Sequence, residues 1–277
     1  MDFENLIYEE KDKVAFITLN RPAKMNALSM ALSDEIIAAV DHVQESKRLK
    51  FLVFKGAGNN FCVGDDITEM PKWGDANEIM RRARHYQTMA NKIEELDKIT
   101  IAAVDGYAVG GGLEITMACD FVIATERSKW GMPEVDVGIT PGWGGTTRMS
   151  RLIGRRRAKE INLLGALHSG KKAVEWNLWN RLVPNDQLDN EVEKLLEVLR
   201  SKNQQGMRQL KFIINRGVEC DLYTAQGFEA LSAGLTGAVS GMWKVKDADQ
   251  GKGIIGFGRK DGLWQTRRGL AKDFWVD

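Results

Sequence analysis

The sequence has few of the residues that hold metal ions or form disulfides. Its 277 residues include only three cysteines and three histidines. Cys62, Cys119 and Cys220 are widely spaced and form no C-x-x-C pair, and the histidines are scattered as well. Zinc sites and disulfide scaffolds need such residues in closely spaced groups. We therefore expect reduced thiols in a cytoplasmic protein and no metal site.

An excess of one charge, a long apolar run and a signal-like start are also missing. Lys and Arg number 39 and Asp and Glu 38, which leaves a net charge of +1. We therefore expect no nucleic-acid partner, and any bound anion must be held by a local site. No apolar run reaches the roughly 18 residues of a membrane span. Met1–Lys13 is acidic and polar, where a secretory signal is basic and then apolar. We expect no membrane partner and a cytoplasmic location.

The first part of the chain alternates strand and helix patterns. Short apolar segments predict strands at Leu6–Glu9, Val14–Leu19, Phe51–Phe54, Thr100–Val104 and Phe121–Ala124. Apolar residues at helical spacing predict helices over Ser29–Val43, Ala76–Leu96 and Gly112–Ala118. This alternation is typical of βαβ units, so the sequence predicts an α/β fold with a mostly parallel sheet.

The pattern changes after residue 146. Helical spacing is found at Arg148–Leu164, Ala173–Trp176, Leu188–Ser201, Met207–Cys220 and Ala225–Trp243. No strand pattern lies among these segments. The sequence therefore predicts an α/β core of about 145 residues followed by an all-helical part.

Two glycine-containing turns each follow an apolar strand. Gly64 lies in Phe61–Ile67, and three consecutive glycines lie in Gly106–Glu114. Glycines let a backbone approach a ligand closely, and a helix that begins there directs free N–H groups at an anion. Neither turn has the glycine spacing of a nucleotide-binding loop. A triple glycine alone is equally consistent with close packing of a helix start against a strand.

Two glutamates stand out from the other acidic residues. Glu114 lies within the apolar stretch Leu113–Ala118, which indicates a buried position. Glu134 follows Pro133, and a further glycine-rich turn, Thr140–Thr146, comes shortly after it. Burying a carboxylate costs free energy unless it is paired or protonated, so buried carboxyl groups are candidates for function.

Taken together, these segments resemble the crotonase (enoyl-CoA hydratase/isomerase) superfamily. The resemblance is carried by Asn20–Leu28, Phe61–Ile67, Val104–Phe121, Trp130–Glu134 and Gly138–Arg148, which follow the family's order and spacing. It extends from residue 3 to about residue 200. It implies a crotonase-like ββα spiral core over residues 1–200 and a helical trimerisation region over residues 201–277. A homotrimer or homohexamer is expected.

The resemblance also implies roles for individual residues. The backbone amides of Asp65 and Gly111 would form an oxyanion hole for a thioester carbonyl. Glu114 and Glu134 would lie across the substrate double bond, one taking a proton from water and the other delivering a proton to the α-carbon. The implied enzyme is a lyase that adds water to, or eliminates it from, an enoyl- or dienoyl-CoA. The CoA thioester is the substrate, and no separate cofactor is expected.

Further positions resemble those that hold the substrate. The residues matching the CoA-binding segments are Lys24, Ala27, Asp66, Ile67 and Thr68. Lys24 either contacts a CoA phosphate or is a solvated lysine.

Two positions lie next to the expected chemistry. Gly142 matches the position whose amide helps to hold the catalytic water. Trp143 stands where the family has a small residue. It either shapes the acyl pocket or packs against the helical part. Asp65 also replaces a small residue.

Two other functions stay open. One is hydrolysis or C–C bond cleavage of a cyclic ketoacyl-CoA, and the other is a non-catalytic RNA-binding or scaffold role. The glutamate pair argues against the second, as does the lack of a basic patch beyond the Arg155–Arg157 cluster. Asp249–Lys260 is a weak counterpart of the family's usual end, and Asp261–Asp277 extends beyond it. Aromatic residues in this extension suggest docking on a neighbouring subunit.

Overall fold

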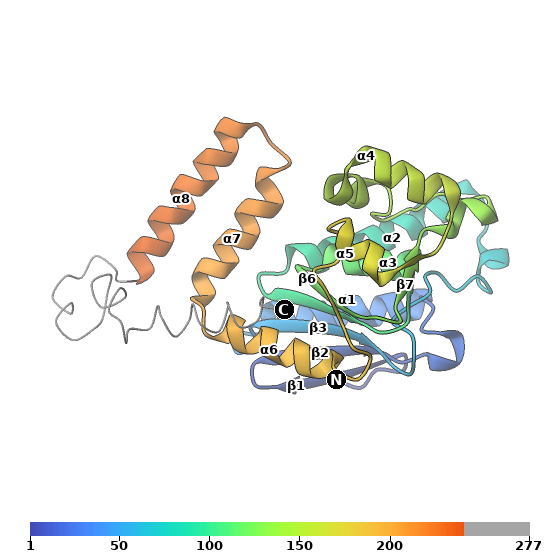
Figure 1. The fold of residues 1–277 in the computed structure, drawn as a ribbon, viewed down its shortest axis with the longest axis horizontal. Coiled ribbons are helices and arrows are strands. Elements are labelled where there is room, and N and C mark those ends of the chain that lie inside the picture. The colour runs from blue at the N-terminus through green and yellow to red at the C-terminus, as the bar shows by residue number, and fades with distance from the viewer. Residues whose placement is uncertain (241–277) are drawn as a thin grey trace. The chain divides into compact units, whose positions relative to one another are not determined.

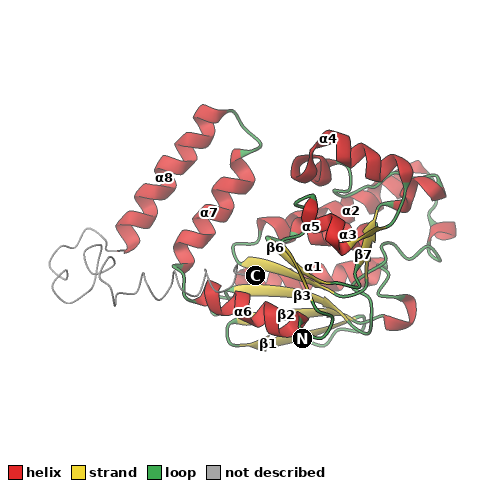
Figure 2. Cartoon of the chain, viewed as in Figure 1, coloured by secondary structure: helices red, strands yellow, loops and turns green. Residues whose placement is uncertain are grey.

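A computed structural model describes residues 1–240 of the chain (Figure 1, Figure 2). Asp249–Lys260 and the extension Asp261–Asp277 lie outside the described residues. The chain divides into two compact units, Met1–Val192 and a second that begins at Glu193. No helix within the described part is long and apolar enough to cross a membrane. The division of the chain at residue 200 stays a prediction.

A six-stranded sheet is the frame of the first unit. Its order is β1-β2-β3-β4-β6-β9. The strands are β1 (Leu6–Lys11), β2 (Val14–Leu19), β3 (Phe51–Gly56), β4 (Ile99–Val104), β6 (Phe121–Thr125) and β9 (Arg181–Val183). β1 and β2 form an antiparallel hairpin, and every other neighbouring pair is parallel. Asp12 and Lys13 have positive φ in the two-residue turn, which suits the twist of a tight hairpin.

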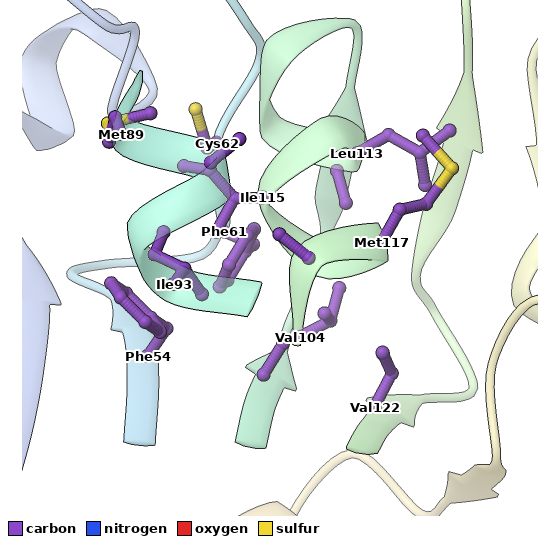
Figure 3. Close-up of a cluster of buried hydrophobic side chains, with 14 of the residues drawn as sticks. Phe54, Phe61, Cys62, Met89, Ile93, Val104, Leu113, Ile115, Met117 and Val122 are labelled. Carbon is purple, nitrogen blue, oxygen red and sulfur yellow. The ribbon is translucent and has the colours of Figure 1, made fainter. Parts of the chain in front are cut away.

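Three helices in this unit, α1 (Met30–Glu45), α2 (Ala76–Glu95) and α3 (Gly111–Ala118), bury apolar faces. Ser29 caps α1, because its side chain accepts a hydrogen bond from the Leu32 amide at 3.2 Å. Figure 3 shows strand side chains such as Phe54 and Val104 in one buried cluster with Ile93 of α2 and Ile115 of α3. This core holds α3, and with it the consecutive glycines at its start, against the sheet.

A second, three-stranded sheet was not expected from the sequence. It consists of β5 (Tyr107–Val109), β7 (Lys129–Gly131) and β8 (His168–Ser169). β5 lies in the segment interpreted as a glycine-containing turn, and no strand was predicted at β7. β8 and β9 lie in the part predicted to be all helical, so that expectation was wrong. Strands of two or three residues are too short to show an alternating pattern, and only their pairing with distant segments defines them.

The predicted helices beyond residue 146 are present as far as the structure describes them, and residues 241–243 of the last one, Ala225–Trp243, lie outside the described residues. They are α4 (Thr147–Leu164), α5 (Gly170–Glu175), α6 (Leu188–Arg200), α7 (Gln204–Gly217) and α8 (Leu222–Ser240). α4 is kinked at Gly154, whose φ of 80° is not helical. In the second unit α7 packs on α8, with the rings of Phe212 and Phe228 5.5 Å apart. Both helices also leave large apolar side chains exposed, among them Ile214 and Leu231.

Candidate active site

The two glycine turns predicted to bind the thioester lie side by side. Gly64 has a φ of +92°, and a Cβ added to it would lie 3.0 Å from the Val109 carbonyl oxygen and 3.1 Å from the Gly111 nitrogen. Its own carbonyl accepts a hydrogen bond from the Leu28 amide at 2.8 Å. Only glycine allows this conformation and this close approach without strain. Gly64 therefore brings Asp65 and Gly111 onto adjacent segments.

The amides of Asp65 and Gly111 are both available to a ligand. Gly111 is the first residue of α3, and the first amides of a helix have no acceptor within it. Among residues 1–240, neither of these two amides donates a hydrogen bond to another protein group. The positive end of a helix dipole and two unpaired N–H groups favour an oxygen that carries negative charge.

Glu114 lies on α3 and is fully buried, with 0% of its surface exposed. Its Oε1 accepts hydrogen bonds from the amides of Trp143 at 3.0 Å and Gly145 at 2.6 Å. Its Oε2 is buried and has no partner within the described residues. Burial raises the pKa of Glu114 to about 8, although the two amide hydrogen bonds lower it. The carboxyl group is thus held in one orientation, and its burial favours the protonated form.

Glu134 supplies the second carboxyl group, from the 3-10 helix Pro133–Val137 that follows β7. Its Oε2 is also buried and unpartnered among residues 1–240. A side chain at position 110 would crowd this carboxyl group, because a Cβ added to Gly110 would lie 2.9 Å from Glu134 Oε1. Gly110 also has a φ of +52°, which favours glycine. Burial raises the pKa of Glu134 to about 7. Burial is the largest cause of the raised pKa of Glu114, and the charge of Glu134 adds to it, which places the two carboxyl groups near each other.

Trp143 forms an aromatic wall with Tyr86 of α2. Only 5% of Trp143 is exposed, and its ring stacks on that of Tyr86 with centroids 4.7 Å apart and planes 14° apart. A Cβ on Gly111 would lie 2.1 Å from Trp143 Cζ2, so the indole covers the Gly111 backbone. The indole therefore lies at the predicted oxyanion donor, packed on a core helix.

Three of the predicted CoA-binding residues lie around a partly buried ion pair. Asp66 lies 2.9 Å from Arg21 Nη2, and Arg21 also donates to the Ala27 carbonyl. Thr68 Oγ1 donates to Asp66 at 2.6 Å. Burial raises the pKa of Asp66, but the hydrogen bonds from Thr68 and Arg21 outweigh it and leave this pKa below its ordinary value. The Asp66 side chain thus fixes the shape of this segment.

Two other predicted CoA-binding residues face solvent. Lys24 is exposed at the end of the 3-10 helix Pro22–Lys24, and Ile67 is 65% exposed. Both side chains are open to a ligand.

Some groups at the site were missed by the sequence analysis. Tyr86 and Gln87 come from α2, where the sequence predicts only a core helix. Gln87 Nε2 donates to the Gly142 carbonyl at 2.6 Å and so fixes the turn beside Trp143. Gly145 was visible in a glycine-rich turn, but nothing in that turn pointed to Glu114 as its partner. Within residues 1–240, no group of His, Cys, Asp and Glu side chains is arranged to hold a metal ion.

The geometry defines a class of site. Two free amides lie near two carboxyl groups whose pKa values are raised by burial. Such groups can stabilise an enolate and move protons to and from it.

Comparison with known proteins identifies the family. The family model described as enoyl-CoA hydratase/isomerase matches residues 9–257. A crotonyl-CoA hydratase of Syntrophomonas wolfei is 36% identical over 262 residues, which cover 93% of this chain and 96% of that protein. A short-chain-enoyl-CoA hydratase of Clostridium acetobutylicum is 36% identical over 239 residues, which cover 84% of this chain and 90% of that protein. The crystal structure of an enoyl-CoA hydratase from Bacillus anthracis has a TM-score of 0.82 and 31% identity, covering 88% of this chain and 96% of that one.

The chain therefore belongs to the enoyl-CoA hydratase/isomerase family, within the crotonase superfamily, and is an enoyl-CoA hydratase-like enzyme. The crotonase fold predicted from the motifs is confirmed. The roles of the individual site residues stay predictions.

Proposed function

We propose that this protein catalyses the reversible addition of water to the double bond of an enoyl-CoA or dienoyl-CoA thioester. The names of its relatives support the substrate class, since those proteins are crotonyl-CoA and short-chain-enoyl-CoA hydratases. The observation that carries the proposal is Glu114, a fully buried carboxyl group with one oxygen fixed by two amides and the other unpartnered among the described residues.

In the proposed reaction the amides of Asp65 and Gly111 bind the thioester oxygen. The oxygen of water bonds to the β-carbon while one carboxylate of the glutamate pair takes its proton. The π electrons move onto the thioester oxygen as an enolate, which the amides stabilise. The other glutamate then gives its proton to the α-carbon. The product is a 3-hydroxyacyl-CoA, and the pair has as many protons as before.

The unpartnered oxygens favour a bound water between the glutamates. Glu114 Oε2 and Glu134 Oε2 are both buried without a protein partner in residues 1–240. A buried acceptor without a hydrogen bond costs free energy, and a shared water would satisfy both groups. The Trp143 and Gly145 amides hold Glu114 in place before the substrate arrives, so little reorganisation is needed for the reaction.

The remaining features are proposed from the same comparison. Lys24, Ala27, Asp66, Ile67 and Thr68 would hold the CoA portion, and the Gly142 amide would help to hold the water. The thioester itself accepts the electrons, so no cofactor is needed. A homotrimer or homohexamer would cover part of the apolar surface exposed on α7 and α8. We also propose that the protein is located in the cytoplasm.

Turnover of crotonyl-CoA tests the proposal. The absorbance of the conjugated thioester should fall as water is added, and the Glu114→Gln variant should hydrate far more slowly. Cyclic dienoyl-CoA and ketoacyl-CoA substrates are assayed in parallel. Consumption of the cyclic ketoacyl-CoA alone would favour a hydrolase. If no thioester were consumed, the hydration proposal would be wrong.

A further inference from the structure

Asp65 places a third carboxyl group beside the glutamate pair. Its backbone amide is one of the two proposed oxyanion donors, and its side chain occupies a position where the crotonase motif has a small residue. The side-chain Oδ1 is buried and has no hydrogen-bond partner within residues 1–240.

Tyr86 lies near this carboxyl group. The Tyr86 side chain lowers the pKa of Asp65, and Oδ1 is an Asp65 oxygen without a hydrogen-bond partner among residues 1–240. The Tyr86 ring stacks on Trp143, and Trp143 covers Gly111. The Asp65 carboxyl group therefore lies near the aromatic wall, on the residue whose backbone amide is proposed to bind the thioester.

The electrostatic surroundings of Asp65 place it near the glutamate pair. Burial, together with the charges of Glu134 and Glu69, raises the pKa of Asp65 to about 7. Arg82 lowers this pKa, but its Nε donates to Glu78 at 2.9 Å and its Nη1 lies 3.9 Å from Glu69. Asp65 forms no ion pair within the described residues.

The proposed hydration does not explain this side chain. Any residue supplies a backbone amide, and a negative charge near the thioester disfavours a developing enolate. A buried acceptor that lacks a partner also lowers stability until a donor reaches it. A hydrogen-bond donor carried by the substrate would offset the second cost, because it satisfies Oδ1.

We propose that Asp65 is a specificity residue whose side chain accepts a hydrogen bond from a hydroxyl group on the acyl chain of the substrate. The preferred substrate is then a short, hydroxyl-bearing enoyl-CoA, with the Trp143–Tyr86 wall limiting the chain length. This inference rests on the proposed hydration and names the substrate class for that same site.

The test compares two substrates of equal chain length, crotonyl-CoA and 4-hydroxybut-2-enoyl-CoA. The ratio of their kcat/KM values is measured in the wild type and in the Asp65→Ala, Tyr86→Phe and Glu126→Gln variants. A hydrogen bond to a charged group predicts that the wild type favours the hydroxylated substrate at least about tenfold. The ratio should fall to about one in Asp65→Ala and to an intermediate value in Tyr86→Phe. Glu126→Gln removes an exposed carboxylate that is not among the charges acting on Asp65, so it should keep the wild-type ratio.

Using a ratio separates specificity from any general loss of activity. Equal rates for the two substrates in the wild type would overturn the inference, because Oδ1 would then be satisfied by water. A preference that survives in Asp65→Ala would overturn it too. Hydration of neither substrate would instead refute the proposed function. Should Asp65→Ala fail to fold, the affinities of the wild type for 4-hydroxybutyryl-CoA and butyryl-CoA, measured by calorimetry, decide the question: the hydroxylated ligand must bind more tightly.

Discussion

Replacing Glu114 by glutamine tests the chemistry of the site with little change in its shape. Glutamine keeps a carbonyl oxygen that can accept hydrogen bonds from the Trp143 and Gly145 amides. In the wild type these amides donate to Glu114 Oε1 at 3.0 Å and 2.6 Å. It has no group that takes up or releases a proton near neutral pH. We expect turnover of crotonyl-CoA to fall by about two to four orders of magnitude, as when a general acid or base is lost.

The same substitution should lower turnover but increase the free energy of unfolding. Burial raises the pKa of Glu114 from 4.5 to about 8 in the folded protein. Between these two values the folded state keeps a proton that the unfolded state has lost. Stability therefore falls as pH rises, by about 1.4 kcal/mol per pH unit for this group. Glutamine does not titrate, so the stability of the variant lacks this pH dependence. Its free energy of unfolding should exceed that of the wild type only slightly near pH 4.5 and by the largest amount above pH 8.

Two measurements test the catalytic role of Glu114 and its raised pKa. Hydration is followed by the loss of thioester absorbance, and unfolding by circular dichroism at about pH 5.5 and about pH 8.5, on either side of most of the titration. The variant should be more stable than the wild type at the higher pH by more than it is at the lower pH. Near-normal turnover would refute the catalytic role of Glu114. A stability difference independent of pH would refute the raised pKa.

Three further predictions concern the same site and the assembly. Glu134→Gln should also reduce turnover by about two to four orders of magnitude, since it removes the other member of the acid–base pair; near-normal rates in both glutamine variants would exclude the two-glutamate mechanism. Trp143→Ala removes one half of the wall over Gly111, so specificity constants for long enoyl chains should rise relative to short and cyclic ones, within the roughly 1–3 kcal/mol of apolar pocket contacts. An equal change for all three substrate types would make Trp143 a packing residue. Light scattering should give a trimer or hexamer, and a monomer at micromolar concentration would contradict the proposed assembly.

Much of the fold and part of the site could be predicted from local sequence constraints. The longer strands and helices were evident because four or more apolar residues in a row or at helical spacing carry a detectable period. Gly64 was recognisable because its turn needs a residue that tolerates positive φ. Glu114 was recognisable because a carboxyl group in an apolar helical segment is costly unless it has a function.

The tertiary structure decided what surrounds these residues. Glu114 accepts hydrogen bonds from amides 29 and 31 positions further along the chain, and no local pattern encodes such a pairing. In the sequence, Tyr86 has the pattern of an ordinary core residue of α2. Only the packing of that helix in the structure places its ring on Trp143. The chain by itself thus determined which groups are available for chemistry. Their orientation, their burial and hence their pKa values come from contacts between distant segments, because desolvation depends on the whole environment of a group.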